Sequence, residues 1–107
     1  MKKLFLTFSF LTLISCGNST PDNSDVKDVA RVVIMSNLKD PTTTKFHHNE
    51  NVKDLGDSTF VYTETINATN SFGGSIAQNA TITIKWAGGE PSEITNWRIV
   101  DTQFEER

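Results

Sequence analysis

Two adjacent histidines and a nearby glutamate are the side chains of this sequence whose types and spacing first suggest chemistry. His47 and His48 carry imidazoles that can bind a metal, and Glu50 adds a carboxylate two residues on. Neighbouring residues on a strand point to opposite faces, so the two histidines are not expected to share one metal. His48 and Glu50 can share a face, but they supply only two of the three or four ligands of a zinc site. We therefore predict solvated histidines and no metal site.

Glu64 raises a second chemical question because it falls in register with Phe60, Tyr62 and Ile66, where a buried face is expected. A buried carboxyl would have a raised pKa and a capacity for proton transfer. The alternative is a bulge or a strand end that lets the side chain reach water, and we favour it. The sequence has no Gly-x-Ser-x-Gly, His-Glu-x-x-His or phosphate-loop motif. We expect no enzymatic activity and no cofactor.

A helix and a sheet must position these groups. Apolar residues recur at three- and four-residue steps from Val26 to Leu38, which predicts an amphipathic helix over residues 25–39. Ser24 is the expected N-cap, and Pro41 lies just beyond the expected end.

After Pro41 the apolar period changes to two. This alternation predicts strands at residues 60–66, 81–86 and 97–100, and a weaker one at residues 45–48 that continues near Val52. The predicted fold is α+β: one N-terminal amphipathic helix packed on a small antiparallel sheet of three to four strands, with a threonine-rich face in solvent. The sheet side of the core is expected to contain Ile82, Ile84, Trp86, Trp97 and Ile99.

The first residues have the order of an export signal. Lys2 and Lys3 precede an apolar run whose helix would be about 18 Å long, shorter than the ~30 Å hydrocarbon core of a membrane. Leu13-Ile14-Ser15-Cys16 resembles the lipobox of bacterial lipoproteins. The resemblance implies that residues 1–15 are removed and that Cys16 is lipidated. The alternative is an ordinary signal with an incidental cysteine.

These boundaries divide the chain into a signal peptide at residues 1–15, a lipidated Cys16 with a flexible spacer at residues 16–24, and a single domain at residues 25–107. By the same resemblance, the lipid on Cys16 attaches the protein to a membrane of the bacterial envelope, and Gly17 favours the outer membrane. A single cysteine rules out an internal disulfide framework. The net charge of −3 argues against nucleic-acid binding.

Two further segments carry a second resemblance. Residues 39–46, Lys-Asp-Pro-Thr-Thr-Thr-Lys-Phe, and residues 66–74, Ile-Asn-Ala-Thr-Asn-Ser-Phe-Gly-Gly, resemble a small domain of unknown function found in short exported, membrane-tethered bacterial proteins. The resemblance implies a helix followed by a sheet and no established activity. This chain departs from it at Thr63 and Glu64, where many of those proteins carry Cys-Gly.

A loop near two lysines is the most plausible recognition surface. The loop contains Phe72, which either packs inward as a plug, the alternative we favour, or projects as an apolar tip. The candidate binding residues are Lys39, Lys45, Asn70, Phe72, Gly73 and Gly74. Separately, Asp57-Ser58-Thr59 resembles an O-glycosylation acceptor of some bacterial envelopes.

The expected function is that of a non-enzymatic binding or assembly module on the envelope. It would present its sheet edge or the loop at residues 70–74 to an envelope protein or a glycan. One alternative is a surface inhibitor or exclusion factor against an incoming enzyme or phage. A second alternative is a small hydrolase, which would need a concave site with convergent polar groups.

Overall fold

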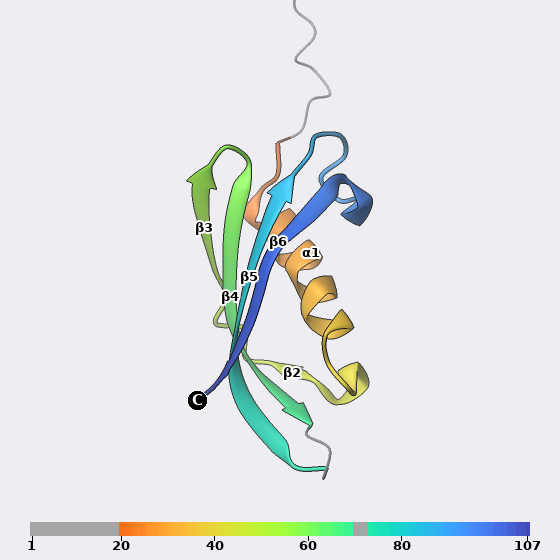
Figure 1. Cartoon of the computed structure of the whole chain (residues 1–107), viewed down its shortest axis with the longest axis vertical. Coiled ribbons are helices and arrows are strands. Elements are labelled where there is room, and N and C mark those ends of the chain that lie inside the picture. The colour runs from red at the N-terminus through yellow and green to blue at the C-terminus, as the bar shows by residue number, and fades with distance from the viewer. Residues whose placement is uncertain (1–19, 70–72) are drawn as a thin grey trace, which may run out of the picture.

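A computed structural model describes residues 20–69 and 73–107, and in it one helix packs against a five-stranded antiparallel sheet (Figure 1). The α+β fold class is therefore confirmed. The elements are helix α1 (Asn23–Ser36) and strands β2 (Lys45–Phe46), β3 (Asn51–Gly56), β4 (Thr59–Thr69), β5 (Ser75–Trp86) and β6 (Trp97–Glu106). Single 3-10 turns lie at Pro41–Thr43 and Ile94–Asn96. The predicted signal and Cys16 lie outside the described residues. No helix among the described residues is both long and apolar enough to cross a membrane.

The helix starts and stops earlier than predicted. Asp22, not Ser24, is the N-cap: its carboxylate accepts the Asp25 N–H at 2.9 Å, while the Asp25 carboxylate accepts the Asp22 N–H at 3.0 Å. The helix ends at Ser36 rather than at residue 39 because the Asn37 N–H bonds the Ile34 carbonyl at 3.0 Å.

The sheet is a meander in which β3, β4, β5 and β6 follow one another across the sheet. Strand β2 pairs with the same edge of β4 as β3 does, through Lys45 opposite Asn67 and Phe46 opposite Ile66. The five strands therefore occupy four positions, and the predicted weak strand is present as two pieces. Residues 47–50 form the interruption between them. On the opposite side of the sheet, β6 pairs with β5 along almost its whole length.

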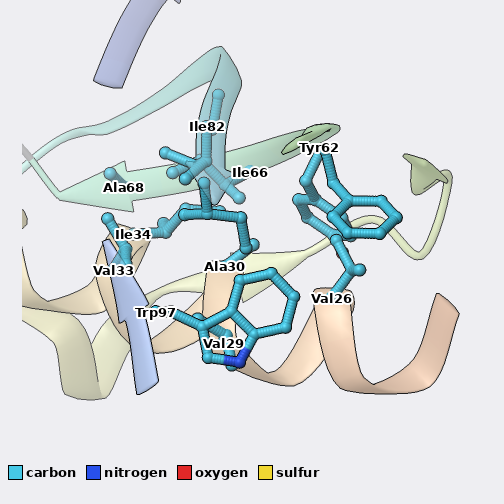
Figure 2. Close-up of a cluster of buried hydrophobic side chains, with 13 residues drawn as sticks. Val26, Val29, Ala30, Val33, Ile34, Tyr62, Ile66, Ala68, Ile82 and Trp97 are labelled. Carbon is cyan, nitrogen blue, oxygen red and sulfur yellow. The ribbon is translucent and has the colours of Figure 1, made fainter. Parts of the chain in front are cut away.

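The core lies between α1 and the inner face of the sheet (Figure 2). The helix packs chiefly against β5, β4 and β3. The buried apolar residues are Val26, Val29, Ala30, Val33, Ile34, Phe60, Tyr62, Ile66, Ala68, Ala80, Ile82, Ile84 and Trp97. Three of the five predicted core residues of the sheet are thus confirmed as buried, and Trp86 is half-buried against the cluster.

The prediction that Ile99 is buried is wrong, because this side chain is 53% exposed. Ile99 lies directly opposite Ile84, which is fully buried, so the two residues share a face of the sheet. Their environments differ because Ile84 is on the strand that α1 covers and Ile99 is on the edge strand. Between Ile99 and Asp101 the strand carries an extra residue, Val100, which is 54% exposed.

Candidate functional site

The interruption between β2 and β3 places several polar groups beside β4. His48 there has a φ of 60°, which turns the chain away from the regular strand path. The His48 N–H donates to Oε2 of Glu64 at 2.9 Å. One residue further on, the Asn49 side chain takes the place of a strand, because its Oδ1 accepts the Thr65 N–H at 2.9 Å. Side chains thus satisfy the backbone groups that the break in the strand leaves unpaired.

Glu64 faces α1 from the middle of β4 and is 2% exposed. Arg31 of the helix binds it with two hydrogen bonds, from Nη2 to Oε2 at 2.7 Å and from Nε to Oε1 at 3.0 Å. The Tyr62 hydroxyl donates to Oε1 at 2.5 Å. The guanidinium also lies 4.3 Å from the centre of the Phe46 ring. The expectation that Glu64 reaches water is therefore wrong, because four donors on three residues make its burial tolerable.

The pKa shifts of this group keep Glu64 ionised and keep Arg31 and Tyr62 protonated. Burial alone would raise the pKa of Glu64, but the hydrogen bonds from Arg31, Tyr62 and the His48 backbone outweigh it, and the pKa falls below its ordinary value. The hydrogen bond to Glu64 raises the pKa of Arg31. Burial, and then the bond to Glu64, raise the pKa of Tyr62. The raised-pKa alternative for Glu64 is wrong, and none of these three groups is tuned to exchange a proton near neutral pH.

The same place brings together three groups that could ligate a metal. Ligand atoms of His48, Glu50 and Glu64 all lie within 4.8 Å of one another. Nη2 of Arg31, however, lies 3.4 Å from Nδ1 of His48, 3.8 Å from Glu50 Oε1 and 2.7 Å from Glu64 Oε2. A guanidinium cation is thus already in contact with every one of the three groups, and it would repel a divalent ion. The arrangement fits an ion-pair cluster that joins helix to sheet better than it fits a metal centre.

Sequence reasoning placed His48 and Glu50 on one side of a strand, and it missed both Arg31 and the depth of Glu64. One signal was available. Lys27 and Arg31 are one helical turn apart, and both contact Glu50, with Lys27 Nζ 3.3 Å from Oε2. Two cations on one face of the helix therefore indicate that acidic side chains lie opposite that face on the sheet.

The predicted recognition residues that are described gather at one end of the molecule. Lys39 follows α1, Lys45 begins β2, and Gly73 precedes β5. Figure 1 shows the end of α1, strand β2 and the start of β5 toward the same end of the molecule. A hydrogen bond of 2.6 Å between the hydroxyls of Thr43 and Thr69 connects these segments. Gly73 has a φ of 85°, as expected for the turn.

Of the other predicted recognition residues, the structure describes only Gly74. Gly74 leads directly into β5. Asn70 and Phe72 lie outside the described residues, so the choice between a plug and an exposed tip for Phe72 remains a prediction.

The outer face of the sheet holds a shallow polar hollow of about 300 Å³. Asn49, Thr63, Thr65, Asn79, Thr81 and Glu105 contribute to its lining. At its centre, the Thr65 hydroxyl accepts from Asn49 Nδ2 at 2.9 Å and donates to Asn79 Oδ1 at 3.0 Å. The expected threonine-rich face is present, although Thr65 itself is buried. The side chains of Asn49, Thr65 and Asn79 therefore already bind one another across the hollow.

The outer edge of β6 differs from the ion-pair cluster, the recognition residues and the polar hollow. Within residues 20–69 and 73–107, no strand pairs with that edge. It is ten residues long, and it exposes Ile99 and Val100 next to each other. An edge of this kind presents unpaired backbone donors and acceptors together with apolar side chains.

Comparison of the chain with protein-family models, with curated proteins and with solved structures found no match. Both resemblances drawn from the sequence therefore stay predictions.

Proposed function

We propose that this chain is a lipid-anchored protein of the bacterial envelope whose folded part is a non-enzymatic binding module. The observation that carries the proposal is the outer edge of β6, with its exposed Ile99 and Val100 and its unpaired outer side within the described residues. The lipid on Cys16 is the proposed attachment, as the sequence Leu13-Ile14-Ser15-Cys16 suggests.

The buried polar groups support a binding module over an enzyme. Glu64, Arg31 and Tyr62 bind one another, and their shifted pKa values keep each in a single protonation state near neutral pH. A catalytic acid or base needs the opposite, a pKa near the working pH. The cluster therefore serves to join α1 to the sheet.

The chemistry of the β6 edge favours a protein partner over a glycan. An edge strand recognises an extended segment of protein through main-chain hydrogen bonds, and apolar side chains beside it add buried area. Glycan recognition would draw on aromatic side chains, whereas the large hydrophobic side chains exposed on this edge, Ile99 and Val100, are aliphatic.

Two measurements in the native host test the proposal. Fractionation should find the wild-type chain in membranes and the Cys16→Ser variant in the soluble fraction. A photo-crosslinking amino acid at Val100 should capture a defined protein, while the same group at Lys53, which is exposed on the opposite edge, should not. A soluble wild-type chain would overturn the attachment, and equal labelling from both positions would overturn the binding edge.

A further inference from the structure

We propose that the outer edge of β6 pairs with the same edge of a second copy of this chain, antiparallel and centred on Thr102. The inference rests on the proposed function, because it names the partner of the binding edge described above. It is carried by the register of β6 and by the charges that this register places on each face.

The bulge at Val100 fixes which residues share a face. Asp101 lies opposite Thr83 and Ile99 lies opposite Ile84, so Val100 is the extra residue between them. Ile99 and Phe104 therefore lie on the face that α1 covers, since their partners Ile84 and Ala80 are buried in the core. Arg98 and Glu105 lie on the outer face, opposite Lys85 and Asn79.

A twofold axis at Thr102 makes this edge complementary to itself. Asp101 then meets Gln103 of the second copy, a carboxylate opposite an amide. Because the bulge accommodates one extra residue, Ile99 meets Phe104 and Arg98 meets Glu105 of the second copy. Each pair occurs twice by symmetry. Two ion pairs would thus form on the outer face and two apolar pairs on the inner face.

Neighbouring registers are disfavoured by like charges. Centring the pair on Asp101 would place the two Asp101 carboxylates opposite each other. Centring it on Gln103 would place Asp101 opposite Glu105 and Arg98 opposite Arg107. Like charges directly opposite on paired strands are destabilising. Of these three registers, only the one centred on Thr102 matches charge with opposite charge.

The groups that would meet have no competing ion pair. Arg98 and Glu105 are exposed, and neither takes part in a salt bridge within the described residues. Ile99 is the exposed apolar residue nearest the bulge, and Phe104 is half-buried against the core. Pairing would cover both and would double the width of the sheet.

Charge reversal on the full-length chain in detergent tests the ion pairs. Sedimentation should show a monomer–dimer equilibrium for the wild type. Arg98→Glu should weaken dimerisation about tenfold, because two ion pairs of roughly 0.2–1 kcal/mol each become two repulsions. The double variant Arg98→Glu with Glu105→Arg should restore it. The matched control Lys53→Glu, on the opposite edge, should leave dimerisation unchanged.

Disulfide formation tests the register separately. Thr102→Cys should form a dimer disulfide on mild oxidation, because opposite residues of an antiparallel pair have Cβ atoms about 4.5–5.5 Å apart, close to disulfide distance. Lys53→Cys should not. A disulfide from Thr102→Cys that forms no faster than the one from Lys53→Cys would overturn the proposed register.

The two proposals fail in different ways. A wild type that remains monomeric, or a double variant that fails to restore dimerisation, would overturn self-pairing. If Val100 crosslinks only to a different envelope protein, self-pairing is wrong and the binding edge stands. If Val100 crosslinks to nothing, both are wrong.

Discussion

The two edges of this sheet differ in how they treat the backbone groups that an edge strand leaves unpaired. On one edge the strand is cut into β2 and β3, and the break is filled by Glu64, Asn49 and a helix arginine. On the other edge β6 runs for ten residues with a single bulge and two exposed aliphatic side chains. We call the first edge the finished edge, because buried polar and charged side chains satisfy the backbone groups at its break. The second keeps its pairing capacity, and we place the protein's function there.

The largest expected effect is the loss of the helix cation from the finished edge. Arg31→Met leaves the Glu64 carboxylate buried without its charge partner, so the free energy of unfolding should fall by about 3–5 kcal/mol. Urea unfolding measures this loss. Lys27→Met is the matched control one helical turn away, where the ion pair with Glu50 is partly exposed and should contribute at most about 1 kcal/mol. Equal losses of stability in the two variants would mean that the buried Glu64 does not depend on Arg31 as its charge partner.

A matched pair of isoleucines compares a covered strand with the open edge. Ile84 and Ile99 lie opposite each other, yet only Ile84 is buried. Ile84→Ala should cost about 2–5 kcal/mol, because it creates a cavity. Ile99→Ala should cost under about 1 kcal/mol in the monomer, because no cavity forms at an exposed site. Thermal unfolding of the two variants in dilute solution would decide, and similar losses would mean that β6 is covered.

Acid should act on the first edge through Glu64. Its pKa is lower in the folded protein than in the unfolded chain, so its stabilisation is complete above about pH 4.5 and is lost as the pH falls through the folded pKa. Glu64→Gln should therefore show a shallower loss of stability below pH 4.5 than the wild type. Unfolding curves from pH 3 to 7 measure it, and parallel curves would show that Glu64 titrates alike in both states.

The smallest effect is expected at the turn that leads from the finished edge into β4. Asp57 and Ser58 both have positive φ, at 55° and 59°, in a two-residue hairpin turn whose second position favours glycine. Ser58→Gly should raise the free energy of unfolding by about 0.5–1 kcal/mol, as relief of backbone strain exceeds the added entropy of the unfolded chain. A destabilised variant would mean that the Ser58 side chain has a role of its own.

Periodic apolar residues predicted the elements of this fold well, because burial follows spacing. The stripe from Val26 to Leu38 and the alternations at residues 60–66 and 81–86 all became elements, although β5 begins at Ser75, well before the predicted start. Ile99 was predicted wrongly because alternation shows which face a residue shares but not whether the helix reaches that far. Glu64 was predicted wrongly because its partner Arg31 is 33 residues away in sequence, and no local pattern shows their contact. The acidic residue in an apolar register was itself a sign that a partner compensates its charge, as was the spacing of Lys27 and Arg31 on the helix.

The most direct test of the difference between the edges is amide hydrogen exchange at two protein concentrations. If β6 is the pairing edge, its amides that do not bond to β5 should exchange freely in dilute solution and become protected as the concentration rises. The Thr65 and His48 amides, which bond to side chains at the break, should be protected equally at both concentrations. Exchange at β6 that is the same at both concentrations would show that this edge does not pair.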